Sequence, residues 1–223
     1  MKYAVNEIIA TMQGEGFHAG RRCVLLRFSG CNLWNGTEDG RRIGKGSCAV
    51  WCDTSFRPSE QLSLSELLAR VEHLRLPGDP WPFIVLTGGE PTLQLTSDLV
   101  TSLKRSGWQV AIETNGTIPD LLLAELDWIT VSPKIGAPLL LSFAHEVKVV
   151  LPGALPPAYG WSDADLERFA AKYPSALSLI VQPQDEVPHG TLHRKAMRRC
   201  AEFVLSHPRW RMSVQLHKLC GLP

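Results

Sequence analysis

Residues 82–92 read P-F-I-V-L-T-G-G-E-P-T. The first five form a short apolar run, which is typical of a buried β-strand. The run leads into Thr87 and two adjacent glycines, which let a ligand approach the backbone closely. Glu90 adds a carboxylate that can accept hydrogen bonds from an ammonium group, and Pro91 begins a predicted helix at a position where proline is favoured. The segment predicts one strand–turn–helix unit of a parallel sheet, with a ligand at the carboxyl end of the strand.

Strands and helices alternate on both sides of this segment, and polar residues follow the ends of several strands. Such alternation indicates an α/β fold built on a mostly parallel sheet. With 223 residues the chain is short for a closed eight-stranded barrel, so we expect an incomplete (partial) TIM-type barrel. The other predicted strands cover residues 3–9, 23–29, 109–113, 128–132, 146–151, 177–181 and 210–216, and the predicted helices cover residues 63–74, 92–106, 163–173 and 191–205.

Composition places the chain among ordinary globular proteins, with 44% apolar and 20% charged residues. We expect residues 1–223 to form a single domain with a sizeable core. The formal charge of +1 predicts no broad basic face, which argues against a nucleic-acid partner. Residues 1–10 are too mixed for a signal peptide, and no run of about 18 apolar residues is present to span a membrane. The reducing cytoplasm is therefore the expected location.

Three of the six cysteines, Cys31, Cys48 and Cys52, lie in one polar stretch. The segment between the first two contains four glycines and five charged side chains, which favours an exposed loop. A free cysteine is usually a small buried residue, so three of them on a polar loop suggest metal ligands. Three thiolates can hold three irons of a [4Fe-4S] cluster and leave the fourth iron open to a cosubstrate.

Zinc and inert thiols are competing interpretations of this loop. A structural zinc site needs four ligands and usually shows a second Cys or His pair at short spacing, whereas His18 and His73 are lone candidates. Disulfides are possible, but a chain of this length can bury a core without them. Cys23 and Cys200 are expected in the core. The loop alone leaves a cluster, zinc and inert thiols open.

Other polar groups near strand ends are suited to ligands, although each also has a structural explanation. The sequence Q-G-E-G at residues 13–16 combines open backbone with an amide and a carboxylate, but it also fits a turn between two strands. Arg27, inside a predicted strand, either faces the surface, forms a structural ion pair or is held for an anion such as a carboxylate. Thr54 could ligate a metal, but threonine is common in loops. Similar groups are E-T-N-G (113–116), S-P-K (132–134) and Q-P-Q-D (182–185).

The three cysteines and residues 87–91 in one α/β chain resemble the radical S-adenosylmethionine superfamily. Within it, the sequence is similar to the 7-carboxy-7-deazaguanine synthase family. The motifs occur in the family's order and cover nearly the whole chain. Those that narrow the resemblance are Q-G-E-G (13–16), C-D-T (52–54), E-T-N-G (113–116), S-P-K (132–134) and H-K (217–218).

The resemblance implies that Cys31, Cys48 and Cys52 hold a [4Fe-4S] cluster whose open iron binds S-adenosylmethionine. One electron would cleave this cofactor to methionine and a 5′-deoxyadenosyl radical, which takes a hydrogen from C6 of 6-carboxy-5,6,7,8-tetrahydropterin. The ring would contract and lose ammonia, giving 7-carboxy-7-deazaguanine for queuosine and 7-deazapurine biosynthesis. Thr54 would ligate Mg²⁺, which binds the substrate carboxylate. A flavodoxin-type reductant and a homodimer are also implied.

The resemblance assigns roles to further residues. Arg27 would face the substrate carboxylate, and in the family a C-terminal proline carboxylate also reaches the substrate, a role that falls to Pro223 here. The other implied substrate contacts are Met12, Gln13, Gly14, Glu15, Thr87 and His217. The implied cofactor contacts are Gly89, Glu90, Ser132, Pro133, Lys134, Gln182, Pro183, Gln184 and Asp185.

Two features depart from the family pattern. Three residues separate Cys48 from Cys52, where the superfamily leaves two, and we expect the loop to bulge and keep its ligands. Residues 219–223 read L-C-G-L-P where the family usually has Y-L-N-I-P, and Cys220 within them is expected to be a packed thiol.

Two other functions fit part of the sequence. A glycyl-radical activating enzyme would share the cluster and residues 87–91, but it has no need of residues 13–16 or of Thr54. A zinc-stabilised binding module without catalysis would contain zinc in place of iron, and it would leave the glycine-rich strand ends without a purpose.

Overall fold

The computed structural model describes residues 1–37, 52, 54–119, 122, 125–152, 160–185 and 194–222. Its strands form one nine-stranded sheet in the order β3-β1-β2-β4-β5-β6-β7-β8-β9. All neighbours from β2 to β9 are parallel, whereas β1 pairs antiparallel with both β2 and β3. The strands are β1 (Lys2–Met12), β2 (Arg22–Phe28), β3 (Glu60–Ser63), β4 (Phe83–Gly88), β5 (Gln109–Thr114), β6 (Trp128–Val131), β7 (Glu146–Leu151), β8 (Ser178–Pro183) and β9 (Trp210–Met212).

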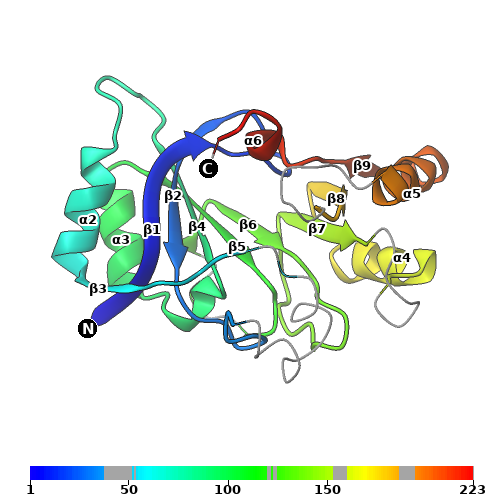
Figure 1. Ribbon diagram of the computed structural model, residues 1–223, viewed down its shortest axis with the longest axis horizontal. Coiled ribbons are helices and arrows are strands. Elements are labelled where there is room, and N and C mark those ends of the chain that lie inside the picture. The colour runs from blue at the N-terminus through cyan, green and yellow to red at the C-terminus, as the bar shows by residue number, and fades with distance from the viewer. Residues whose placement is uncertain are drawn as a thin grey trace.

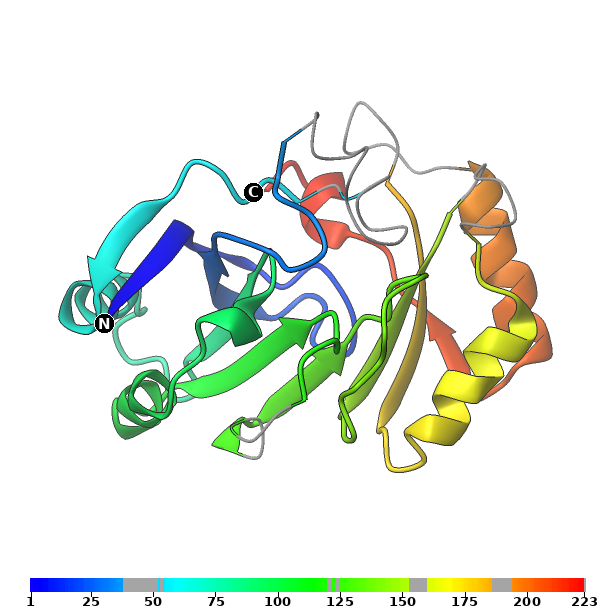
Figure 2. The ribbon, with the colours of Figure 1, turned by 90° about the horizontal axis from the view of Figure 1, so that it is seen from below.

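The sheet curves into an open barrel with helices on its outer side (Figures 1 and 2). Helices α2 and α3 cover one end of the curve, and α4 and α5 cover the other. The sheet does not close, because β3 and β9 remain its two edges, and this confirms the expected partial barrel. The helices are α2 (Leu64–His73), α3 (Ser97–Arg105), α4 (Asp163–Lys172), α5 (Arg194–Ser206) and the short α6 (Leu216–Leu219), with a 3₁₀ turn η2 (Pro91–Leu93).

Alternation along the central strands explains why both sheet faces are buried. In β4, Ile84 and Leu86 belong to the main core with helix residues such as Leu67 and Leu99. Phe83 and Val85 point to the opposite face and pack with Cys23, Ala111 and Trp128. Burial on both faces is usual for parallel strands, and the inner face leaves room for a site only toward the carboxyl ends of the strands.

The helix predicted over residues 92–106 is wrong in its first part. The chain makes the η2 turn and begins α3 only at Ser97, after Thr96 accepts a hydrogen bond from the Leu99 amide at 3.2 Å. The strand predicted over residues 210–216 is also too long, because β9 ends at Met212 and the chain turns into α6. Strand β3 has no counterpart among the predicted strands.

Residues 132–145, between β6 and β7, contain no helix. Within the described residues, no helix has the length and apolar character to cross a membrane.

Candidate active site

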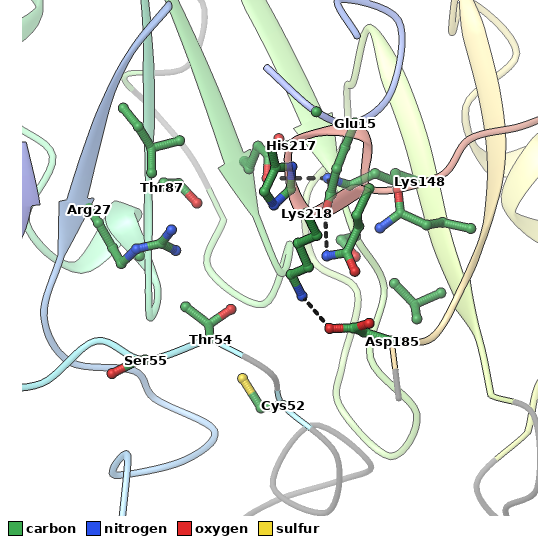
Figure 3. A pocket seen from close by; sticks show the side chains of 18 of the residues that line it. Glu15, Arg27, Cys52, Thr54, Ser55, Thr87, Lys148, Asp185, His217 and Lys218 are labelled. Carbon is green, nitrogen blue, oxygen red and sulfur yellow. Dashed lines mark hydrogen bonds and ion pairs between the residues drawn. The ribbon is translucent and has the colours of Figure 1, made fainter. Parts of the chain in front are cut away.

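A cavity of about 300 Å³ opens at the carboxyl ends of the parallel strands. Most residues predicted for substrate, cofactor and metal line this one cavity (Figure 3), although they come from every part of the chain. The predicted residues that line it are Met12, Gln13, Gly14, Glu15, Arg27, Cys31, Cys52, Thr54, Thr87, Gly89, Ser132, Lys134, Gln182, Pro183, Gln184, Asp185 and His217.

Two of the three predicted cluster ligands lie together at the rim of this cavity. Cys31 and Cys52 both pack against a small cluster of Trp34 and Phe56. The Leu33 amide donates to the Cys31 sulfur at 3.4 Å, an arrangement that suits a thiolate. Burial raises the pKa of the Cys31 thiol, as expected for a cysteine that loses its proton only when a metal binds. The residues present fit a cluster, and Cys48 lies outside the described residues.

The two glycines of T-G-G-E-P have a packing role that the sequence analysis did not anticipate. A side chain on Gly89 would overlap the Gly30 carbonyl and come within 3.0 Å of the Cys31 Cβ. Gly88 has a φ of +137°, and a Cβ there would overlap the backbone of Phe28. The absence of both side chains therefore brings the end of β4 against the start of the cysteine loop.

The side chain of Glu90 does not line the cavity, in contrast to the predicted contact with an ammonium group. It is fully buried and accepts hydrogen bonds from Thr92, from the Thr114 hydroxyl at 2.8 Å and from the Asn115 amide at 2.8 Å. Burial of a carboxylate requires such partners. Glu90 thus ties the end of β4 to the end of β5.

The cavity floor is a network of charged and amide side chains. Lys148 of β7 forms ion pairs with Glu15 and, at 3.2 Å, with Glu113 of β5. Gln13 donates to Glu113 at 2.9 Å, and Gln215 donates to Glu15 at 2.7 Å. Burial acts to raise the pKa of Glu15, but Lys148 and Gln215 outweigh it and lower this pKa to about 2. The floor therefore presents Glu15 as an ionised carboxylate, with the Lys148 ammonium between it and Glu113.

The tail after β9 packs onto the turn after β1. The Leu216 amide donates to the Gly14 carbonyl at 2.9 Å, and the Ser213 hydroxyl accepts from the Gly16 amide at 3.0 Å. A side chain on Gly14 would overlap the ring of His217, so glycine is required there. This packing brings His217 into the cavity, although it lies more than 200 positions after Gly14 in the sequence.

A second group of polar side chains faces the floor from β2, β4 and the segment after Cys52. Figure 3 shows Arg27, Thr54 and Thr87 near one another, on a different side of the cavity from Glu15 and Lys148. Arg27 is held by Glu7 of β1 at 2.5 Å, so it points inward and forms an ion pair. Two interpretations of Arg27, an ion pair and a cation held for an anion, are thus compatible.

The remaining wall comes from the ends of β6 and β8. The Lys134 ammonium donates to Ser132 at 2.7 Å, and Lys218 of α6 pairs with Asp185 at 2.7 Å. The side-chain oxygen of Gln182 is buried without a hydrogen-bond partner among the described residues. A buried acceptor that lines a cavity and lacks a donor suits a ligand that supplies one.

Besides Glu90, three predicted site residues are not placed in the cavity. Pro133 is buried in the chain between Ser132 and Lys134 but is absent from the lining. Cys48 and Pro223 lie outside the described residues.

The lining residues that were not predicted include Glu7, Glu113, Lys148 and Gln215. Glu113 was noted only as part of a polar strand end. Lys148 lies in E-V-K-V-V-L, where a charged residue within an apolar strand gives the same signal as Arg27. Gln215 gives no such signal, because its place depends on the turn of the tail.

Cysteines beside a glycine-rich strand end, on a partial barrel, define the radical S-adenosylmethionine class. The model of the Radical SAM superfamily matches residues 47–149. A crystal structure of QueE from Escherichia coli has the same fold, with a TM-score of 0.70 and 23% identity over 97% of this chain and 95% of that one.

Curated relatives give the particular family. The 7-carboxy-7-deazaguanine synthases of Bradyrhizobium diazoefficiens and Caulobacter vibrioides are each 40% identical to this chain, and that of Burkholderia multivorans is 39% identical. Each alignment covers 100% of both chains. The chain therefore belongs to the 7-carboxy-7-deazaguanine synthase family of radical S-adenosylmethionine enzymes. This supports the main interpretation over a glycyl-radical activating enzyme or a zinc module.

Proposed function

We propose that this protein converts 6-carboxy-5,6,7,8-tetrahydropterin to 7-carboxy-7-deazaguanine and ammonia, with residues 1–223 acting as one radical S-adenosylmethionine domain. The observation that carries the proposal is one cavity whose lining brings together two cysteines of the predicted cluster, two carboxylates and an arginine. The relatives that bear the name of this activity align over the full length of the chain.

Cys31, Cys48 and Cys52 would hold the [4Fe-4S] cluster. When bound, the cluster supplies the electron that cleaves S-adenosylmethionine and so generates the radical that takes hydrogen from the substrate. Gly89, Ser132, Lys134 and residues 182–185 would bind S-adenosylmethionine. The unpartnered Gln182 oxygen supports this assignment, since it needs a donor such as a ribose hydroxyl or an amino group.

The substrate would lie between the floor and Arg27. The floor, Gln13 and Glu15 in particular, offers acceptors to the N–H groups of the pterin ring, with Met12, Gly14, Thr87 and His217 around it. Arg27 would bind the pterin carboxylate, and Pro223 would contact the substrate. The Thr54 hydroxyl would be one ligand of Mg²⁺, an ion that keeps other positions for water and for substrate oxygens.

The test is turnover by anaerobically reconstituted protein supplied with dithionite, S-adenosylmethionine, Mg²⁺ and the tetrahydropterin. We expect 7-carboxy-7-deazaguanine and ammonia in equal amounts, and no product from the Cys52→Ala variant, which should also bind less iron. Cofactor cleavage that never yields the deazaguanine would contradict this substrate. A colourless protein that takes up zinc in place of iron would contradict the radical chemistry as well.

We further propose that a flavodoxin-type protein is the physiological reductant, that the protein is a cytoplasmic homodimer, and that Mg²⁺ raises the turnover rate. These three proposals rest on the family alone. Light scattering of the purified protein tests the dimer, substitution of dithionite by reduced flavodoxin tests the reductant, and a chelator titration followed by Mg²⁺ addition tests the ion.

A further inference from the structure

Lys148 is the most deeply buried cation of the cavity floor. It is 4% exposed, and its ammonium lies between the carboxylates of Glu15 and Glu113. A lysine is rarely buried without such partners, because removing its charge from water is costly. Two facing carboxylates would also repel each other if no cation lay between them. Lys148 therefore compensates a charge arrangement that would not be stable without it.

Each carboxylate is also fixed at its second oxygen. Gln215 donates to Oε1 of Glu15 at 2.7 Å, and Gln13 donates to Oε1 of Glu113 at 2.9 Å. The five side chains come from the turn after β1, from β5, from β7 and from the tail before α6. With two carboxylates and one ammonium, the network carries a formal charge of −1, and Lys148 is its only cation.

Other titratable groups face the same network. Glu146, two residues before Lys148 in β7, is buried and accepts from the Phe17 amide at 2.6 Å, and burial raises its pKa. His217 of α6 has its pKa lowered by burial. Burial would lower the pKa of Lys148, but the charges of Glu113 and Glu15 outweigh it and raise this pKa, so the ammonium stays charged at neutral pH.

We propose that Lys148 is a positioning residue for the pterin, because its ammonium holds Glu15 and Glu113 side by side as acceptors for the N–H groups of the pterin ring. The inference rests on the proposed function. Lys148 acts through the two carboxylates and does not itself take part in the chemistry. Without it, burial would favour the protonated form of at least one carboxyl, which would then donate where the substrate needs an acceptor.

The test measures binding of 6-carboxypterin, a fluorescent oxidised analogue of the substrate, to reconstituted enzyme with S-adenosylmethionine and Mg²⁺ between pH 5.5 and 7.5. Lys148→Met should weaken binding at least about tenfold, as expected for charge-assisted hydrogen bonds. Its affinity should fall further as the pH is lowered, whereas wild-type affinity should stay level. Lys148→Arg should restore most of the binding, since it keeps the charge.

Cleavage of S-adenosylmethionine without pterin serves as the internal control, and Lys148→Met should lose much less of it than of pterin binding. The matched surface variant is Lys104→Met, which breaks an ion pair with Asp127 at 2.9 Å outside the cavity and should bind the analogue like wild type. If Lys148→Met does not fold, the Lys148→Met/Glu113→Gln variant removes the cation together with one carboxylate and should give the same weakened, pH-dependent binding.

The outcomes separate the two proposals. Wild-type protein that neither binds the analogue nor converts the tetrahydropterin would overturn the proposed function. If the wild type behaves as expected, the role of Lys148 is overturned when Lys148→Met binds the analogue with unchanged affinity and a level pH profile. Equal loss of pterin binding and cofactor cleavage, without rescue by arginine, would also overturn it, because a general structural role would produce that result.

Discussion

Arg27 and Lys148 are both cations on the inner face of the sheet, and each is matched by carboxylates. Arg27 forms an ion pair with Glu7, which lies directly opposite it on the neighbouring strand β1. Lys148 is paired across the barrel with Glu15 and Glu113. A single carboxylate leaves other donors of a guanidinium free for a second anion, whereas two carboxylates leave the lysine group with a surplus of acceptors. A buried cation thus helps to form a site for an anion on one side of the cavity and a site for N–H donors on the other.

Arg27→Lys is expected to reduce pterin affinity about 10- to 100-fold, because lysine loses the planar fork that binds a carboxylate through two hydrogen bonds. The measurement is the KM for the tetrahydropterin at saturating S-adenosylmethionine. The control is Arg22→Lys in the same strand, whose side chain bonds to the Leu74 carbonyl at 2.7 Å, away from the cavity. An unchanged KM in Arg27→Lys would contradict the placement of the substrate carboxylate.

Gly89→Ala should be far more damaging than a typical surface substitution, because the added methyl group would overlap the Gly30 backbone. We expect a lower melting temperature and less iron per chain after reconstitution. Gly78→Ala is the comparison, since Gly78 has a φ of +78° but open space around it. It should cost only about 1 kcal/mol through backbone strain. Equal iron content in both variants would mean that close packing at Gly89 does not support the cysteine loop.

At the scale of the elements, helix α2 shows where sequence signals suffice. Ser63 is its N-cap, and Ser63 and Glu66 form a capping box, in which each side chain accepts from the backbone of the other. The signal is local in sequence, so the helix start could be predicted at this residue.

Ser63→Ala should therefore lower the free energy of unfolding by about 1 kcal/mol, because the first turn of α2 loses its cap. Chemical denaturation of the reconstituted protein measures this change. Ser65→Ala in the same turn is exposed and should change the stability by less than about 0.5 kcal/mol. Similar losses in both variants would argue against the cap.

The two wrong element boundaries have long-range causes that are absent from the local sequence. Residues 92–96 could continue into a helix, but the Gln94 side chain instead bonds to the backbone of Ala4 and Ser29, which draws the turn onto the ends of β1 and β2. Similarly, β9 stops at Met212 because the residues after it bond to the turn at residues 14–16. Contacts between segments about 65 to 200 residues apart decide both boundaries.

The same distinction applies to the candidate site. Motifs with unusual residues at strand ends, such as residues 87–91 and 13–16, could be assigned from sequence together with the family resemblance. The orientation of the Glu90 side chain could not be predicted in this way. Its hydrogen-bond donors are Thr92 of η2, Thr114 at the end of β5 and Asn115 just after it. Lys148 and Gln215 were missed because their partners are known only once the barrel is assembled.

At the scale of the whole molecule, the barrel is open between its edge strands, and two irregular segments fill this side. The turn at residues 13–16 and the tail at residues 213–217 contact each other, and Figure 1 shows α6 beside the end of β1. The Phe17 ring stacks on Trp128 at 4.8 Å and anchors the turn inside the barrel. The floor of the cavity thus combines side chains of β5 and β7 with two segments that belong to neither the sheet nor the outer helices.

Removal of residues 213–223 should leave the sheet folded but loosen this floor, because the Gly16 amide and Glu15 lose their partners in the tail. We expect faster hydrogen exchange in peptides that cover residues 13–21 and no pterin binding. Peptides from β4 and β5 should keep their protection and serve as the internal control. Unchanged exchange in residues 13–21 would show that the turn is stable without the tail.

The bond between Gln215 and Glu15 also has a consequence for how the protein is made. During translation the β1–β2 hairpin can form early, since its contacts are local, but Glu15 meets its amide donor only after residue 215 has left the ribosome. A nascent chain can therefore acquire most of its sheet while Glu15 still lacks the amide donor of Gln215. Only the finished polypeptide would bind the substrate. A stalled or shortened translation product would be folded in large part but would not bind the pterin.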